Sequence, residues 1–221
     1  MSDQNLLPLF PLNTVLFPGQ LLPLHIFEER YKLMIKQCLQ EEGTFGVVLI
    51  REGNEVGETA TPFDVGTVAR IRRVDQTEEG KMNILCLGEA RFKITALNEE
   101  QPYLSASFEI WPWRPLQPGE VEPRSSQLKQ LLTRYLKLLA AVTHNTVNLD
   151  DLPAEPLLLA DLAAIALQVP NREKQQMLSE PSLSEFIDTC IALLKRENQA
   201  LQTLSAIPIA YDNKPPSFSQ N

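Results

Sequence analysis

The sequence predicts an α+β protein in which a mainly β segment with one helix precedes an all-helical segment. About six short apolar or alternating stretches fill the first half, whereas apolar residues recur at helical spacing in the second. A proline-rich connector at 111–123 separates the two patterns. Because the first half lacks repeated crossover helices, we expect a compact β-barrel there. The predicted organisation is a barrel at 1–118, a four-helix bundle at 119–205 and a flexible tail at 206–221.

The opening segment at 6–31 contains two apolar runs on either side of a turn at 17–20. Four prolines interrupt these runs: Pro8, Pro11, Pro18 and Pro23. Each proline lacks a backbone N–H donor. We therefore expect both runs at a sheet edge or a barrel rim, and not as central strands.

A helix and a buried strand are expected next. The segment 28–42 has one apolar stripe at helical spacing, made of Tyr31, Met34, Ile35, Cys38 and Leu39. Gly43 is expected to end this helix. The run at 44–51 is apolar at consecutive positions, which is typical of a strand covered on both faces. An exposed loop is expected at 52–61.

The remaining strands are predicted from alternation. The segments 65–74 and 82–87 read as a hairpin. Gly88 then interrupts the pattern before it resumes at 91–96, so we expect a bulge or a sharp bend at this glycine. The inner face of a last strand is expected to consist of Leu104, Ala106, Phe108 and Ile110.

Four helices are predicted in the second half. Apolar residues recur at helical spacing over 128–142 and again over 156–167. A short third helix follows Pro170, with Asn171 as the expected N-cap. Before the fourth helix, Ser182 and Glu185 have the spacing of a capping box.

The charge balance disfavours nucleic acid as a partner. Twenty Lys and Arg against 28 Asp and Glu give a net charge of −8, whereas phosphate binding draws on clustered Lys and Arg. The N-terminus lacks the pattern of a secretory signal, and no apolar run reaches membrane-spanning length. We therefore expect a cytoplasmic protein with neither a nucleic-acid nor a membrane partner.

Neither a metal, a cofactor nor a catalytic centre is expected. Cys38, Cys86 and Cys190 are far apart, which favours buried free thiols over a disulfide or zinc site. The sequence has no Gly-x4-Gly-Lys-Ser/Thr loop for nucleotide phosphates and no Gly-x-Ser-x-Gly motif. Only His25 and His144 are available as histidines, and neither is near a recognisable nucleophile and acid. The sequence thus predicts a protein that is not an enzyme.

Two sets of residues have alternative readings. His25 is expected to be a structural histidine that bonds to the backbone or to Glu28, in preference to a ligand or catalytic group. Trp111 and Trp113 suit either interdomain packing or an exposed recognition anchor, and packing is favoured.

Several stretches, in the same order, resemble the N-terminal domain of Lon proteases. They are the opening segment through His25-Ile-Phe-Glu-Glu-Arg-Tyr31, Gly43-Thr-Phe-Gly-Val-Val-Leu49, Val65-Gly-Thr-Val-Ala-Arg-Ile71, Leu87-Gly-Glu-Ala-Arg-Phe-Lys-Ile94, and the helical segments 157–164 and 172–178. The resemblance implies a PUA-like β-barrel followed by a four-helix bundle, an architecture shared by the N-terminal part of cereblon. Fold alone does not identify the partner.

The resemblance implies a substrate-recognition part, since the ATPase and the serine–lysine peptidase of Lon are missing from this sequence. In the family this part is thought to engage unfolded polypeptide and to assist oligomer assembly. We therefore expect a protein- or peptide-binding module, such as an adaptor for a separate ATP-dependent protease. An apolar groove between barrel and bundle, or an open barrel edge, is the expected site. Its expected neighbours are His25, Phe27, Tyr31, Trp111 and Trp113.

Two alternatives remain open from the sequence. The PUA-like resemblance also suits an RNA-binding module, which the acidic charge disfavours. A small-molecule-binding domain that uses the barrel mouth would need a pocket where several polar groups converge.

Overall fold

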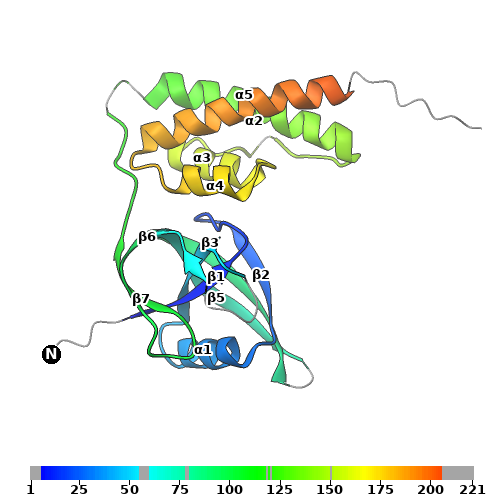
Figure 1. Ribbon diagram of the computed structural model, residues 1–221. Helices are drawn as coiled ribbons and strands as arrows, with labels where there is room; N and C mark the ends of the chain where they lie inside the picture. The colour runs from blue at the N-terminus through cyan, green and yellow to red at the C-terminus, as the bar shows by residue number, and fades with distance from the viewer. Residues whose placement is uncertain are drawn as a thin grey trace, which may run out of the picture.

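The computed structural model describes residues 6–54, 60–77, 80–117, 119, 121–149 and 151–205. A strand-rich layer lies between α1 on one side and the helices α2 to α5 on the other (Figure 1). The strands are β1 (Leu7–Leu12), β2 (Leu21–Ile26), β3 (Thr44–Glu52), β4 (Thr61–Pro62), β5 (Val65–Gln76), β6 (Met82–Asn98) and β7 (Ser105–Ile110). The helices are α1 (Glu29–Gln40), α2 (Val121–Thr143), α3 (Pro156–Ala166), α4 (Asn171–Leu178) and α5 (Leu183–Ser205). The described chain is therefore α+β, as predicted.

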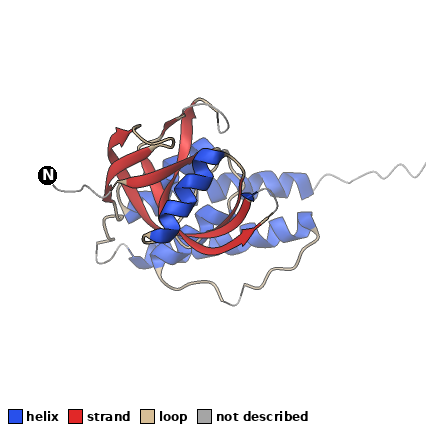
Figure 2. Ribbon diagram, turned by 90° about the horizontal axis from the view of Figure 1, so that it is seen from below, coloured by secondary structure: helices blue, strands red, loops and turns tan. Residues whose placement is uncertain are grey.

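The strands pair into a closed circuit. The sheet order is β1-β7-β6-β5-β3-β4, and β1 pairs with β3 as well, which joins the two ends of the five-strand path from β1 to β3. The long strand β6 pairs with β2 over its first part and with β7 over its second. Figure 2, seen from below, shows these curved strands behind α1.

The expectation that both proline-broken runs lie at an edge is wrong for β1 and right for β2. Strand β1 is buried throughout and pairs on both sides. Its start, at Leu7 and Pro8, pairs with β7, whereas its remainder pairs in parallel with β3. A strand residue directs its N–H to one neighbour only, so each proline removes a single ladder bond. Among the described strands, β2 pairs with β6 alone.

The expected irregularity at Gly88 is present as a bulge. The pairing of β6 with β5 slips by one residue here, because Val68 faces Ala90 while Ala69 faces Gly88. Gly88 also bonds to the turn at 17–20, accepting from the Gly19 amide and donating to the Gln20 carbonyl, each at 2.9 Å. A Cβ at Gly88 would collide with the carbonyl oxygen of Phe17. Only glycine lets the turn approach β6 this closely.

Two apolar residues expected to be buried are exposed. In α1, Tyr31, Met34, Ile35 and Cys38 are buried as predicted, but Leu39 is 47% exposed. Leu39 is about 80° around the helix from Tyr31 at ~100° per residue, so it lies at the margin of the stripe. In β7, Ala106 is buried and Ile110, at the end of the strand, is 54% exposed.

The helices form where the apolar spacing predicts them, with one error at a helix start. Pro170, not Asn171, is the N-cap of α4, and the Asn171 side-chain amide donates to the carbonyl of Asn13 instead. The expected capping box is present in part: Ser182 Oγ accepts a hydrogen bond from the Glu185 amide at 3.2 Å, whereas the Glu185 carboxylate accepts from the Ser182 hydroxyl at 2.5 Å and not from the Ser182 backbone amide.

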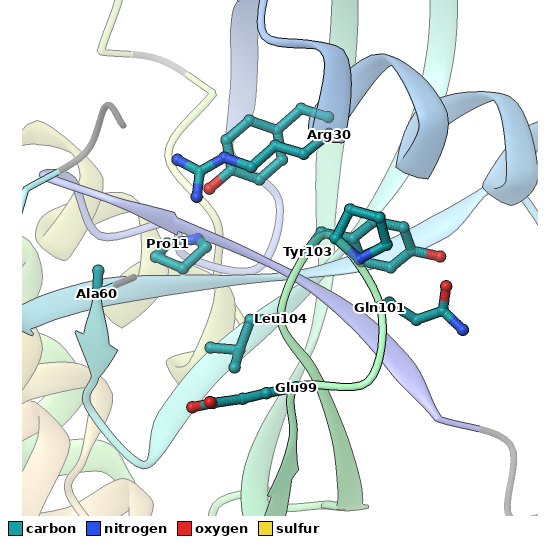
Figure 3. Close-up of a pocket in the computed structure, with 9 residues that line it drawn as sticks. Pro11, Arg30, Ala60, Glu99, Gln101, Tyr103 and Leu104 are labelled. Atoms are coloured by element: carbon teal, nitrogen blue, oxygen red, sulfur yellow. The ribbon is translucent and has the colours of Figure 1, made fainter. Parts of the chain in front are cut away.

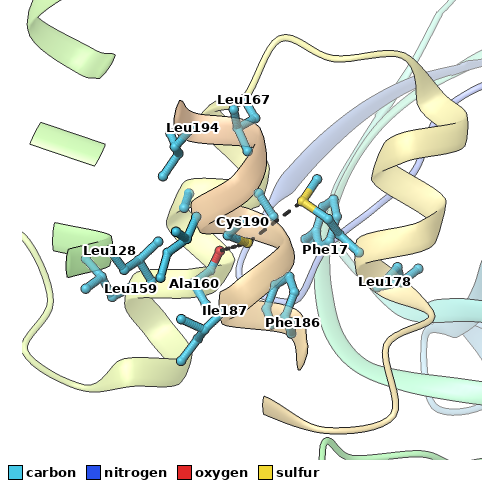
Figure 4. Close-up of a cluster of buried hydrophobic side chains, with 14 of the residues drawn as sticks. Phe17, Leu128, Leu159, Ala160, Leu167, Leu178, Phe186, Ile187, Cys190 and Leu194 are labelled. Carbon is cyan, nitrogen blue, oxygen red and sulfur yellow. Dashed lines mark hydrogen bonds between the residues drawn. The ribbon is translucent and has the colours of Figure 1, made fainter. Parts of the chain in front are cut away.

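The helices and the sheet share one apolar core. The sheet side contributes Val15, Phe17, Leu49 and Val65 to the cluster formed by α2 to α5. The ring of Phe17 lies 6.3 Å from the ring of Phe186 on α5. Figure 4 shows Phe17 beside Phe186, with Cys190 deeper among the helices. The turn at 17–20, which is hydrogen-bonded to Gly88, therefore contributes Phe17 to the core between the sheet and the helices.

Some expectations fall outside the described residues. They are the tail at 206–221 and residues 55–59 of the loop expected at 52–61. Among the helices that are described, none is long and apolar enough to cross a membrane.

Replacement of Gly88 by alanine is expected to destabilise the protein by about 1–3 kcal/mol, because the added methyl group must displace the Phe17 carbonyl and with it the turn. Urea denaturation followed by circular dichroism measures the change. Thr95→Ala, at an exposed position of the same strand, is the control and should stay within about 0.5 kcal/mol of wild type. Equal stability of the two variants would contradict the close approach of the Phe17 carbonyl to Gly88.

Candidate functional site

An apolar pocket of about 210 Å³ lies between strands β1 and β2, next to the start of α1. It is lined by Phe10, Leu12, Pro23, Leu24, His25, Ile26, Phe27, Glu28 and Tyr31. The ring of Tyr31 stacks on the ring of Phe10, with centroids 4.1 Å apart. Strand β2 forms one wall, and this strand pairs only with β6 among the described strands. The pocket thus combines an apolar floor with a strand paired on one side.

A second pocket, of about 130 Å³, lies beside the first and shares Tyr31 with it (Figure 3). Arg30 forms part of its wall and places its guanidinium 4.6 Å from the centroid of the Tyr31 ring. Arg30 also pairs with Glu28 at 3.0 Å. The hydroxyl of Tyr103 donates to Gln37 Oε1 at 2.5 Å. Charged and polar side chains therefore flank the apolar pocket.

His25 does not have the expected partner. Its Nδ1 lies 2.7 Å from Oδ1 of Asn83, the residue directly opposite it in the β2–β6 pair. An amide oxygen only accepts, so Nδ1–H donates. His25 is exposed, and its ring centroid lies 6.0 Å from that of Phe27, which is 47% exposed. Partnership with Glu28 was wrong because cross-strand neighbours on one face lie closest.

The two tryptophans lie elsewhere, at the junction of sheet and helices. The Arg91 guanidinium carbon is 4.5 Å from the centroid of a Trp111 ring and 3.5 Å from that of a Trp113 ring. Trp113 also stacks on Phe186 of α5 at 4.6 Å. The favoured packing reading is thus observed. The five predicted residues form two separate groups, with His25, Phe27 and Tyr31 in one and the tryptophans in the other.

Arg91 is the residue that sequence reasoning missed. It is 2% exposed, and its Nη1 donates to the carbonyls of Leu178 at 2.5 Å and Glu180 at 2.8 Å, at the C-terminal end of α4. A cation is favoured there by the helix dipole. The available signal was a single arginine between Ala90 and Phe92, in a strand followed by two nearby tryptophans.

A third pocket, of about 210 Å³, opens beside Arg91. It is lined by Pro18, Glu89, Ala90, Arg91, Ile110, Pro112, Trp113, Leu157 and Asp161. Burial lowers the pKa of Arg91 to about 9, so the guanidinium stays protonated at neutral pH. Burial raises the pKa of Asp161 to about 7, although the positive charge of Arg91 opposes this shift. Asp161 therefore titrates near neutrality.

The three cysteines are buried free thiols, as predicted. Burial raises the pKa of Cys38 and of Cys86 to about 12, and that of Cys190 further still. Thiols with such values are unreactive at neutral pH. Over the described ranges, no group of three or more His, Cys, Asp or Glu side chains is placed to hold a metal ion.

The fold defines a class of α+β protein in which a curved sheet has one helix on one side and four helices on the other. The family model for the substrate-binding domain of ATP-dependent protease La (LON) matches residues 6–196. The chain therefore belongs to the Lon substrate-binding domain family.

Two solved structures share this fold. A Lon N-terminal domain protein from Xanthomonas campestris aligns with a TM-score of 0.63 and 24% identity, covering 85% of this chain and 98% of the other. The N-terminal domain of a Lon protease from the Mycobacterium avium complex aligns with a TM-score of 0.69 and 20% identity, covering 86% and 98%.

Curated relatives are much longer than this chain. The Lon protease of Anaeromyxobacter dehalogenans is 33% identical and Lon protease 2 of Myxococcus xanthus is 31% identical, each over 207 residues. Each alignment covers 92% of this chain and 25% of the relative. The chain thus spans about a quarter of their length, and the match is to the substrate-binding region, not to the protease or ATPase domains.

Replacement of Arg91 by methionine is expected to lower the free energy of unfolding by about 3–5 kcal/mol, because two buried carbonyls lose their donor and two indoles lose a cation. Urea denaturation measures the loss. Arg73→Met is the control, since this arginine is exposed and pairs only at the surface with Asp75. It should cost less than about 1 kcal/mol. A similar cost for both variants would contradict the interpretation that Arg91 connects the sheet to the helices.

The stability of the wild type relative to Asp161→Asn is expected to fall as pH rises from 5 to 8. The folded-state pKa of Asp161 is raised to about 7, so its protonated form favours folding and this contribution disappears as the carboxyl ionises. The total change is on the order of 1–4 kcal/mol. Urea denaturation of both proteins at several pH values measures it. A difference that does not vary with pH would contradict the raised pKa.

Proposed function

We propose that this chain is a polypeptide-recognition module without catalytic activity, which binds unfolded or peptide segments of other proteins. The observation that carries the proposal is the match of residues 6–196 to a substrate-binding domain. The apolar pocket around Tyr31 supports it, because extended polypeptide binds through apolar side chains placed in such pockets.

The proposed binding surface is the apolar pocket between β1 and β2. Its floor consists of Phe10 and Leu12 of β1, and its rim carries Phe27, which is 47% exposed. A segment lying along β2 would place an apolar side chain over Tyr31 and against Phe27. Pro23 limits main-chain pairing along β2, since it has no N–H. Binding would therefore rest on side-chain burial and tolerate many sequences.

We further propose the fold-level details that the family implies. The closed circuit of strands would be a PUA-like barrel, and α2 to α5 a four-helix bundle. The division would fall at 118, with 1–118 and 119–205 as the two units. Separate expression of each segment tests the division, although the core residues that Phe17 and Val65 give to the helices predict reduced stability for both.

An adaptor role completes the proposal. The relatives that contain the matched region are Lon proteases, which suggests that bound polypeptide passes to a separate ATP-dependent protease. Affinity capture from native lysate, with an unrelated acidic protein as control, tests this role. Specific recovery of an ATP-dependent protease supports the adaptor role, and its absence favours independent binding of clients.

The variant Phe27→Ala is expected to bind fluorescently labelled unfolded casein at least about fivefold more weakly than the wild type, because an aromatic anchor costs ~1 kcal/mol or more when truncated. Fluorescence anisotropy measures the affinity. Leu97→Ala is the matched control, since Leu97 is 45% exposed and lies outside the pocket. It should bind as the wild type does.

Two outcomes contradict this prediction. Absence of wild-type binding at high micromolar concentration would remove the proposed function. Equal weakening by Phe27→Ala and Leu97→Ala would keep polypeptide binding but exclude this pocket as its site.

A further inference from the structure

The guanidinium of Arg91 has one edge without a hydrogen-bond partner among the described residues. Nη1 donates to the two carbonyls at the C-terminal end of α4, whereas Nε and Nη2 are buried and have no hydrogen-bond partner in the described structure. The ring contacts with Trp111 and Trp113 leave the guanidinium edge for hydrogen bonding. Nε–H and Nη2–H form the parallel donor pair that binds a carboxylate in bidentate fashion.

Arg91 lines the third pocket, whose other walls are mainly apolar. Ile110 is 54% exposed and contributes to this lining together with Leu157 and Pro112. The indole Nε1 of Trp113 is a further buried donor without a partner among the described residues. The volume of about 210 Å³ is below the ~300 Å³ at which small-molecule pockets begin. It therefore suits a single amino-acid residue.

We propose that this pocket binds the C-terminal residue of a polypeptide, with its carboxylate on Nε–H and Nη2–H of Arg91 and an aliphatic side chain against Ile110, Trp113 and Leu157. A C-terminal residue carries both groups on one Cα, so the two contacts form together. An internal Asp or Glu brings its carboxylate without an apolar side chain for these walls. The inference deepens the proposed function and rests on polypeptide binding.

Asp161 makes this binding depend on pH. Its Oδ1 is buried in the same pocket and lacks a partner among the described residues. The charged and titratable groups around it are Arg91, Glu89, Glu155 and the Cys190 thiol. An incoming carboxylate repels ionised Asp161 and accepts a hydrogen bond from its protonated form. Because the pKa of Asp161 is about 7, binding takes up a proton and weakens above this pH.

The test uses two N-terminally labelled peptides with the same sequence and a terminal leucine, one with a free carboxylate and one amidated. Fluorescence anisotropy with the full chain measures both affinities. We expect the carboxylate form to bind at least about tenfold more tightly at pH 6, as a bidentate charged pair requires. We also expect its affinity to fall by up to about tenfold per pH unit above 7.

Three variants and one control variant locate the site. Ile110→Glu, at an exposed position, should abolish the preference for the free carboxylate, whereas Leu97→Glu, similarly exposed on another part of the sheet, should keep it. Asp161→Asn should retain the preference and lose its pH dependence. Arg91→Lys keeps the charge but not the donor pair, and should reduce the preference. Thermal denaturation of each variant establishes that it is folded.

The outcomes separate this inference from the proposed function. Equal affinity for the two peptides would overturn the carboxylate site and leave polypeptide binding standing. Binding of neither peptide, together with no binding of casein, would overturn both. A preference for the free carboxylate that persists in Ile110→Glu would also overturn the assignment to this pocket.

Discussion

The burial of one arginine between the sheet and the helices is the constraint on which the rest of the structure depends. Arg91 of β6 places its guanidinium against two indoles and donates to the carbonyls at the C-terminal end of α4. A buried charge is costly unless it is paired and hydrogen-bonded. The connector with the tryptophans and the end of α4 must therefore lie where they do. This interaction fixes the relative position of the sheet and the helices.

A second connection strengthens the first. The bulge at Gly88 admits the turn at 17–20, which carries Phe17 into the helical core beside Phe186. Gln175 of α4 adds a hydrogen bond to the Val65 carbonyl at 3.0 Å. Both contacts lie on the same side of the sheet as Arg91. The opposite side is covered by α1, where Tyr31 separates the apolar pocket from the polar one.

These two sides suit different tasks in one recognition domain. The pocket beside β2 is apolar and presents Phe27, so it favours contacts that depend on side-chain burial. The pocket beside Arg91 has apolar walls around a buried charge, so it favours a partner with one defined polar group. A ligand bound in this pocket would contact Arg91, which also connects the sheet to the helices. Binding at Arg91 is thereby linked to the stability of the whole domain.

Local features of the fold could be predicted from the sequence. Periodicity located the helices, Ser182 marked the start of α5, and Gly88 marked a bulge, because each depends on residues close in the chain. Long-range packing, in contrast, determines that β1 is paired on both sides, that His25 faces Asn83, and that Ile110 is exposed. It alone placed Arg91 between sheet and helices. The hydrogen bonds of His25 and Arg91 join groups 58 to 89 residues apart, whose approach no local pattern encodes.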